Sequence, residues 1–75
     1  MYTISALGHV DLPDELSTAT DAEVEATLRR AAHHLGFEVD EICRVSSVLG
    51  GSCIACVDVV AYTAGTALLV ARPVV

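Results

Sequence analysis

One helical segment between stretches of strand-like sequence constrains this chain more than any other feature. Apolar residues recur there at the three- and four-residue intervals of a narrow helical stripe: Val24, Leu28, Ala31 and Leu35. Thr20 and Glu23 have the spacing of a capping box, in which each side chain accepts a hydrogen bond from the other residue's backbone amide. Gly36 stands where a glycine commonly ends a helix, so the pattern predicts one helix over residues 20–35.

The charged side chains of this helix are ordered so that they complement the helix dipole. Acidic residues come first and basic residues last: Asp21, Glu23 and Glu25, then Arg29, Arg30, His33 and His34. Glu25 and Arg29 have the spacing of a favourable ion pair, so we expect them to contact each other. We also expect Phe37 to close the helix end with an apolar contact.

Strand patterns lie on both sides of the helix. Residues 2–10 alternate apolar and polar side chains and predict a first strand, whereas residues 11–19 predict a loop because they contain Pro13 and several acids. After the helix, from about Ile42, the apolar period becomes two residues. The expected strands in this second half cover residues 38–49, 52–62 and 66–74.

Two glycine-containing pairs separate these later strands. Gly50-Gly51 and Ala64-Gly65 are expected to form two-residue hairpin turns, because such turns require positive φ angles. Residues 1–75 are therefore expected to form a single α+β domain. The predicted fold is one helix packed on a three- to four-stranded antiparallel sheet, with the element order β-α-β-β-β.

Both faces of the expected sheet carry apolar residues. The two hairpin turns would place Cys43 opposite Asp58, and Asp58 opposite Ala71. A single helix covers one face, so we expect a second copy of the chain or another protein to cover the other. The candidate interface consists of Arg44, Val57, Val59, Leu68, Val70 and Arg72. A one-residue change of register would alter this set.

The net charge of the chain is −6, and it contains no lysine. Basic side chains that neutralise phosphates supply most nucleic-acid affinity, so nucleic acid is not an expected partner. The same argument excludes anionic membrane surfaces. The residues before the helix form a candidate acidic surface for a protein partner, and a solvated loop is the alternative interpretation. This surface comprises Asp11, Asp14, Glu15 and Asp21.

Residues 53–71 form an apolar run long enough for a membrane span. Asp58 lies inside the run and Ala64-Gly65 would break it with a turn, so we expect strands here and no membrane association. No N-terminal signal peptide is visible, because residues 2–4 already alternate as a strand. Together with an odd number of cysteines, this predicts a cytoplasmic protein with reduced thiols.

Cys53 and Cys56 have the C-x-x-C spacing found in zinc and redox sites. In a strand, residues three apart point to opposite faces, so the pair is expected to serve as small apolar residues of the core. No metal site is predicted. A thiol or zinc protein that uses Cys43, Cys53 and Cys56 remains an alternative.

Asp58 is a candidate buried polar residue, because it lies in the middle of the most apolar strand. A buried carboxylate requires a partner, which an arginine or a backbone amide would provide, within the chain or across an interface. His33 and His34 are adjacent on the helix and point about 100° apart, so they cannot bind one ion together. His9 is expected to be solvated. No catalytic residue and no cofactor are predicted.

The order of strand, helix and antiparallel strands, with Phe37-Glu38-Val39 after a helix that ends at Leu35-Gly36, resembles the dodecin family. Dodecins are small flavin-binding proteins in which a curved sheet wraps one helix and many copies form a hollow shell. The resemblance covers residues 2–62 and implies oligomerisation. The family stacks flavin on a tryptophan at the position that Gly36 occupies here, so the resemblance does not extend to the flavin site.

These patterns predict a small acidic, non-enzymatic protein-binding module that forms a homo-oligomer through its sheet. Inhibitors and adaptors, some of them encoded by phages, are proteins of this type. The first alternative is a dodecin-like oligomeric carrier of a small ligand. The second alternative is the thiol or zinc protein.

Overall fold

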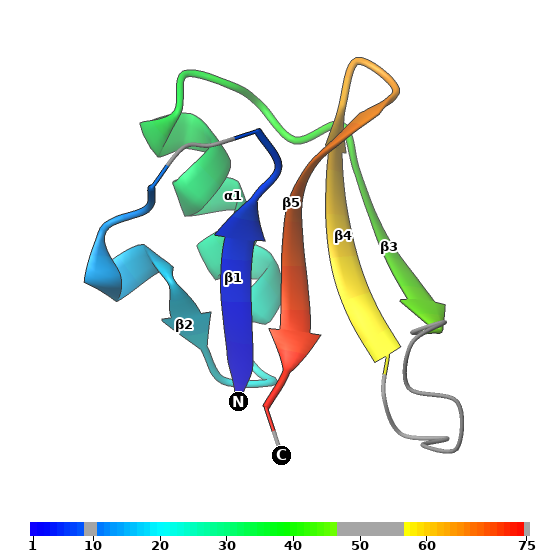
Figure 1. The fold of residues 1–75 in the computed structure, drawn as a ribbon. Coiled ribbons are helices and arrows are strands. Elements are labelled where there is room, and N and C mark those ends of the chain that lie inside the picture. The colour runs from blue at the N-terminus through cyan, green and yellow to red at the C-terminus, as the bar shows by residue number, and fades with distance from the viewer. Residues whose placement is uncertain (9–10, 47–56, 75) are drawn as a thin grey trace.

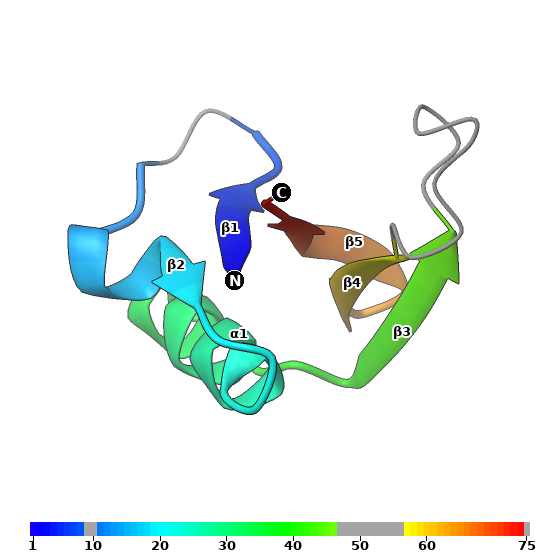
Figure 2. The same cartoon turned by 90° about the horizontal axis from the view of Figure 1, so that it is seen from below.

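The protein folds as a five-stranded antiparallel sheet with one helix on one of its faces (Figures 1 and 2). The computed structural model describes residues 1–8, 11–46 and 57–74. In chain order the elements are β1 (Tyr2–Ala6), the 3-10 turn η1 (Asp14–Leu16), β2 (Thr18–Ala19), α1 (Val24–His34), β3 (Glu41–Ser46), β4 (Val57–Thr63) and β5 (Thr66–Pro73). The strand order across the sheet is β2-β1-β5-β4-β3. The α+β class with an antiparallel sheet is therefore confirmed, and the strand number and element order are not.

The strand missing from the sequence prediction is β2, in the segment expected to be a loop. Ala19 lies opposite Tyr2, and Thr18 lies opposite Thr3. The amide of Ile4 also donates to the carbonyl of Ser17 at 2.8 Å, which extends this pairing past the strand. A two-residue strand has no room for an alternating pattern, so periodicity cannot reveal it. The first strand is also shorter than expected, because β1 ends at Ala6.

The start of α1 differs from the capping-box prediction. The helix begins at Val24, and no side-chain hydrogen bond caps it at Glu23. The Glu23 amide instead donates to the backbone carbonyl of Thr20 at 3.1 Å, which makes a turn outside the helix. The expected ion pair between Glu25 and Arg29 also does not form, although the structure describes both residues. Oε2 of Glu25 instead lies 4.0 Å from Nη2 of Arg44 on β3, and both of these side chains are exposed.

The end of α1 follows the prediction at Gly36. This glycine has a φ of +87°, which places it in the left-handed region. Its amide donates to the carbonyl of His33 at 3.0 Å, and the amide of Phe37 donates to that of Ala32 at 2.9 Å. These two bonds form a Schellman motif, which satisfies carbonyls that the helix end leaves free. Phe37 is 47% exposed, so the apolar closure expected of it is incomplete.

The turn between β4 and β5 is the predicted two-residue hairpin. Ala64 and Gly65 have φ values of 51° and 77°, the pair of positive angles that defines a type I′ turn. The chain before β3 supports this turn from the side. The carboxylate of Asp40 accepts a hydrogen bond from the Ala64 amide at 2.6 Å, and the Thr63 hydroxyl donates to the Glu38 carbonyl at 2.7 Å. The hairpin is therefore fixed by both its own dihedrals and a separate segment.

A register shift in the β4–β5 pair changes which residues share a face. Tyr62 lies opposite Ala67 as expected, but Ala61 lies opposite Leu69, so β5 contains one additional residue at this point. Beyond the shift, Val59 rather than Asp58 lies opposite Ala71. A β-bulge of this kind moves every later side chain of β5 to the other face.

The β3–β4 register also differs from the prediction, but the faces are unchanged. Cys43 lies opposite Val60 instead of Asp58, and Asp58 lies opposite Val45. A shift of two residues preserves the face of each side chain because the side-chain period of a strand is two. The predicted Gly50-Gly51 turn lies outside the described residues.

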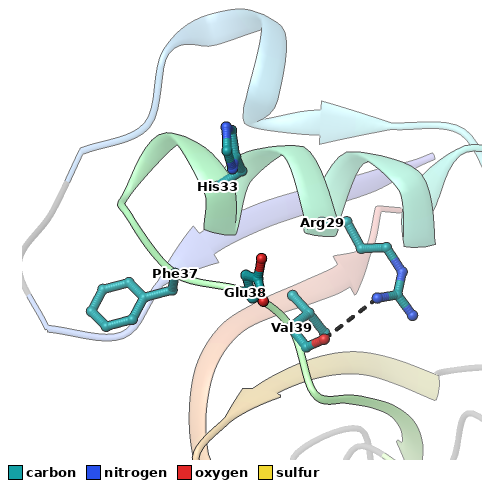
Figure 3. A pocket seen from close by; sticks show the side chains of 5 residues that line it. All are labelled: Arg29, His33, Phe37, Glu38 and Val39. Carbon is teal, nitrogen blue, oxygen red and sulfur yellow. Dashed lines mark hydrogen bonds between the residues drawn. The ribbon is translucent and has the colours of Figure 1, made fainter.

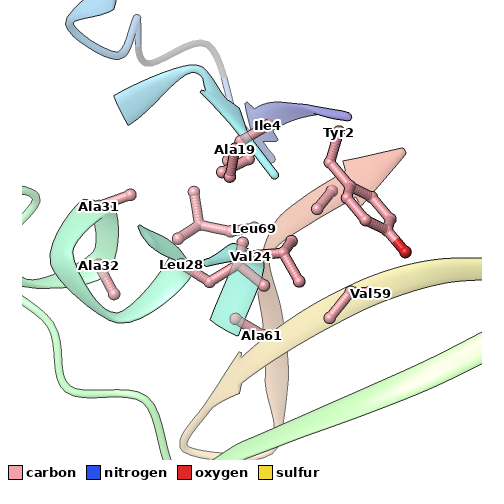
Figure 4. Packing of buried hydrophobic residues seen from close by; sticks show 11 residues of the cluster. Tyr2, Ile4, Ala19, Val24, Leu28, Ala31, Ala32, Val59, Ala61 and Leu69 are labelled. Carbon is pink, nitrogen blue, oxygen red and sulfur yellow. The ribbon is translucent and has the colours of Figure 1, made fainter. Parts of the chain in front are cut away.

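The core lies between α1 and the adjoining face of the sheet (Figure 4). Its largest fully buried side chains come from the helix and from the central strands: Leu28, Leu69, Val24, Val59 and Thr27. Burial of one such aliphatic side chain contributes about 1.5–3 kcal/mol, so this layer is the main source of stability. Ala31 and Ala32 are also completely buried, which indicates close approach of the helix backbone to its neighbours.

Candidate protein-interaction surface

The two faces of the sheet differ in what covers them. The helix packs over one face, where it contacts β2, β4 and β5, and Figures 1 and 2 show β3 lying beyond it. Strand alternation and the observed registers place a second set of side chains on the opposite face, which we call the open face. These residues are Thr3, Ser5, Glu41, Cys43, Val45, Asp58, Val60, Tyr62, Val70 and Arg72.

The six residues of the expected interface do not share one face. Val59 is completely buried in the core, and Leu68 packs against the core beside the bulge. Arg44 and Val57 lie on the face that carries the helix. Val70 and Arg72 lie on the open face, because the bulge moves the side chains that follow it in β5 to the face opposite the expected one. The expectation that all six residues share one face is therefore wrong, and their role at an interface stays a prediction.

Apolar residues of the open face are concentrated on β3, β4 and β5. Four of them form what we call the open-face strip: Cys43, Val45, Val60 and Val70. Val45 is 40% exposed, whereas Val60 is only 7% exposed. On β1 the same face carries the exposed hydroxyl residues Thr3 and Ser5. The open face is therefore polar toward β1 and apolar toward β3, rather than apolar throughout.

An ion pair borders the strip. Nε of Arg72 lies 3.8 Å from Oδ2 of Asp58. The Asp58 side chain is 13% exposed and that of Arg72 is 65% exposed. Asp58 is thus mostly buried and has the arginine partner that its position in the sequence requires. The geometry leaves the guanidinium largely in solvent, where it is accessible to a second acidic group.

Cys43 is the cysteine of the open-face strip. It is partly buried, and its side chain lies on the same face as that of Glu41. Partial burial, a hydrogen bond with Glu41 and the negative charge of Glu41 together raise the pKa of the Cys43 thiol. A thiol with a raised pKa is protonated at neutral pH and is a poor nucleophile. Cys53 and Cys56 lie outside the described residues, so the thiol and zinc alternative stays a prediction.

Strand β3 forms one edge of the sheet. It pairs with β4 on one side, and no described strand pairs with its other side. The opposite edge is β2, which has two residues, whereas β3 has six. An unpaired edge presents backbone donors and acceptors to any other strand that approaches it. The apolar end of the open face therefore coincides with the longer edge of the sheet.

The acidic residues before the helix are all exposed. Asp14 and Glu15 lie in η1, Asp11 precedes it, and Asp21 lies in the turn before α1. The ion pairs found in the described part of the chain involve none of them. These residues contribute a solvent-facing negative surface, and their role in binding stays a prediction.

A shallow depression of about 320 Å³ lies where the chain leaves α1 (Figure 3). It is lined by Arg29, His33, Phe37, Glu38 and Val39. Nη1 of Arg29 donates to the Val39 carbonyl at 3.5 Å, and the ring of Phe37 points away from Arg29. This feature has no signal in the sequence, because it depends on how the chain turns back along the helix after Gly36.

The histidines do not gather into a site within the described chain. His33 and His34 are exposed in the last turn of α1, and His9 lies outside the described residues. Over residues 1–8, 11–46 and 57–74, no group of three or more His, Cys, Asp or Glu side chains is placed to hold a metal ion. In the same ranges, no helix has both the length and the apolar character needed to cross a membrane.

Comparison of the chain with protein-family models, with curated proteins and with solved structures gives no match. The class that the fold defines is a small α+β protein with an antiparallel sheet. The resemblance to the dodecin family stays a prediction. The functional interpretation therefore depends on the surfaces of the molecule itself.

Proposed function

We propose that this protein is a small acidic, non-enzymatic protein-binding module of the inhibitor or adaptor type, which self-associates through its sheet. The observation that carries the proposal is the open-face strip, which the helix does not cover and which reaches β3, whose outer side pairs with no described strand. Val45 is the exposed apolar residue of the strip, and it lies at the sheet edge. Exposed apolar residues at a sheet edge are a recurrent feature of surfaces that bind protein.

The charge distribution of the open face is suited to contact with a protein partner. Asp58 and Arg72 provide one acidic and one basic group side by side. The guanidinium of Arg72 is largely exposed, so it can also contact a carboxylate of that partner.

The acidity of the chain supports a basic protein as a further partner. With a net charge of −6, the molecule attracts basic proteins over several ångströms and repels acidic ones. Such complementarity increases association rates and selects partners more than it increases affinity. We place this protein in the cytoplasm as part of the same proposal, following the sequence argument on its thiols.

A carrier of a small ligand is the second candidate, and the depression at the end of α1 favours it. The depression combines an aromatic ring at Phe37 with a guanidinium at Arg29 and an imidazole at His33. A small anionic or aromatic ligand would find both charge and an apolar surface there.

Native mass spectrometry of the purified protein, over a range of protein concentrations, tests both candidates. An oligomer with no added mass is the expected result and supports the sheet-mediated module. An added small-molecule mass on each subunit would favour the carrier. A monomer of unchanged mass up to the highest concentration would contradict self-association.

A further inference from the structure

We propose that two copies of this chain join by antiparallel pairing of their β3 edges, with Cys43 at the two-fold axis. The inference rests on the proposed self-association and specifies its geometry. It would extend each five-stranded sheet into one continuous sheet, with both helices on the same side.

The choice of β3 follows from a comparison of the two edges. The edge at β2 offers two residues, whereas β3 offers six. Natural edge strands avoid pairing when they are short, contain proline or carry charged side chains, above all lysine. β3 is not short and contains no proline or lysine, and its charged residues are Glu41 and Arg44. Its outer side is therefore the more favourable template for a second copy.

Symmetry limits the registers that this pairing can adopt. A two-fold axis perpendicular to the sheet makes the two strands antiparallel and keeps the two open faces on one side. Directly opposed residues must then belong to the same face, so a residue of the open face opposes another residue of the open face. Registers centred on Cys43 or on Arg44 retain five opposed residues of the six in β3.

Side-chain chemistry selects between these two registers. A register centred on Arg44 places two guanidinium groups directly opposite each other, and like charges in that position are destabilising. A register centred on Cys43 places two small, partly buried thiols together. It also places Glu41 opposite Val45, and Ile42 opposite the aliphatic part of Arg44. The Cys43-centred register is therefore preferred.

This pairing would join the two open-face strips. Cys43 and Val45 of each copy would lie beside the same residues of the other, with Val60 and Val70 continuing outward on both sides. A pairing of five residues buries less than the roughly 800 Å² per partner of a standard interface. The dimer is therefore expected to be weak and to depend on protein concentration. The joined strips would present a wider apolar surface to the protein partner.

Disulfide formation tests the register directly in the native sequence. Opposed residues of an antiparallel pair have Cα atoms about 4.5–5.5 Å apart. A disulfide requires about 4.4–6.8 Å, so two Cys43 residues at the axis are within range. Treatment with diamide would form the Sγ–Sγ bond, with two protons and two electrons transferred from the two thiols to diamide.

Trypsin then identifies the linked cysteine, because cleavage after arginine separates Cys43 from the other thiols. The peptide of residues 31–44 contains Cys43 alone, and the peptide that begins at Val45 contains Cys53 and Cys56. We expect two copies of peptide 31–44 joined by a disulfide as the main cross-linked product. Addition of urea before diamide should abolish this preference.

Charge variants test the pairing without oxidation. In Cys43→Lys, two ammonium groups would face each other at the axis, and we expect the dimer dissociation constant to rise roughly fivefold, the upper range for opposed like charges. Cys43→Ser is the matched control and should dimerise like the native protein. Sedimentation velocity measures the dissociation constants, and circular dichroism checks that each variant is folded.

A second pair of variants applies if Cys43→Lys fails to fold. Val45→Lys would face Glu41 of the other copy and should strengthen the dimer, whereas Val45→Glu should weaken it. Two results together would overturn the edge pairing but not self-association. They are an oligomer that yields no linked 31–44 peptide, and a dissociation constant that these substitutions leave unchanged. A protein that is monomeric at every concentration would overturn both.

Discussion

Nε of Arg72 on β5 lies 3.8 Å from Oδ2 of Asp58 on β4, and the carboxylate of this pair is the mostly buried member. The two residues are brought together by the bulge in β5, which moved Arg72 to the open face. A partly buried carboxylate is stabilised by its partner, so removal of the arginine should cost more than the contact alone would suggest.

The coupling between these two residues can be measured with a double-mutant cycle. We expect Asp58→Asn, Arg72→Gln and the double variant to give a coupling of about 0.5–1 kcal/mol, because the arginine is largely solvated. Urea unfolding provides the four free energies of unfolding. Strictly additive effects of the two substitutions would show that the pair contributes nothing.

The end of α1 should be sensitive to substitution of Gly36. Its φ of +87° is unfavourable for any residue with a Cβ, yet no atom lies within 4 Å of the position a Cβ would occupy. We therefore expect Gly36→Ala to reduce the free energy of unfolding by about 1 kcal/mol from backbone strain alone. Thermal or urea unfolding measures this, and a neutral result would mean that the helix end reforms differently.

Ala64 occupies a conformation that suits it poorly, so the opposite effect is expected there. Its φ is 51°, and it holds the first central position of the type I′ turn. Asparagine tolerates this region, and Asn-Gly is the preferred pair for such turns. Ala64→Asn should stabilise the protein by about 0.5–1 kcal/mol in urea unfolding. Gly65→Ala, at a φ of 77°, is the control of opposite sign.

Leu28 is the largest completely buried side chain of α1. Leu28→Ala should cost about 2–5 kcal/mol, through lost burial and the cavity left behind. A domain of 75 residues has a stability of only about 4–11 kcal/mol. The variant is therefore expected to lose a large fraction of its stability, which urea unfolding followed by circular dichroism measures. Val45→Ala, at an exposed position, should leave the monomer nearly unchanged, and an equal loss in both variants would contradict the assigned core.

Alkylation of Cys43 should depend on Glu41. The raised pKa of the thiol means that less thiolate is present at any pH below it, so reaction with iodoacetamide should be slow at neutral pH. Glu41→Gln removes the negative charge and should lower the thiol pKa, which increases the rate at a given pH. The rate is followed on peptide 31–44 as a function of pH. An unchanged pH profile would remove Glu41 as a cause.

Local patterns in the sequence predicted some elements well. The apolar stripe of the helix and Gly36 located α1 and its end, and Ala64-Gly65 located the hairpin, because each depends on neighbouring residues alone. Thr20 has a capping sequence, but the helix starts four residues later, at Val24. Backbone turns at Thr20–Glu23 compete with a side-chain cap for the same donors.

The faces of the sheet could not be predicted as well, since they depend on register. The bulge lies in β5 between Ala67 and Leu69, the partners of Tyr62 and Ala61, and adds one residue there. An apolar run of sequence gives no signal for such a bulge. This shift moved Leu69 and Ala71 into the core and Val70 and Arg72 out of it. The residues of the candidate interface therefore lie on two faces, and an arginine was one of several partners that the sequence allowed for Asp58.

The position of β1 has a consequence for how the chain assembles. β1 lies between β2 and β5, so that Tyr2 is opposite Pro73, and the amide of Val74 donates to the carbonyl of Met1 at 2.9 Å. Pairings between distant parts of a chain form slowly, because a long loop must close before any contact is gained. During synthesis, β1 would have to wait for β5 to leave the ribosome before the middle of the sheet could close. The apolar face of β1 therefore needs protection until β5 has been synthesised.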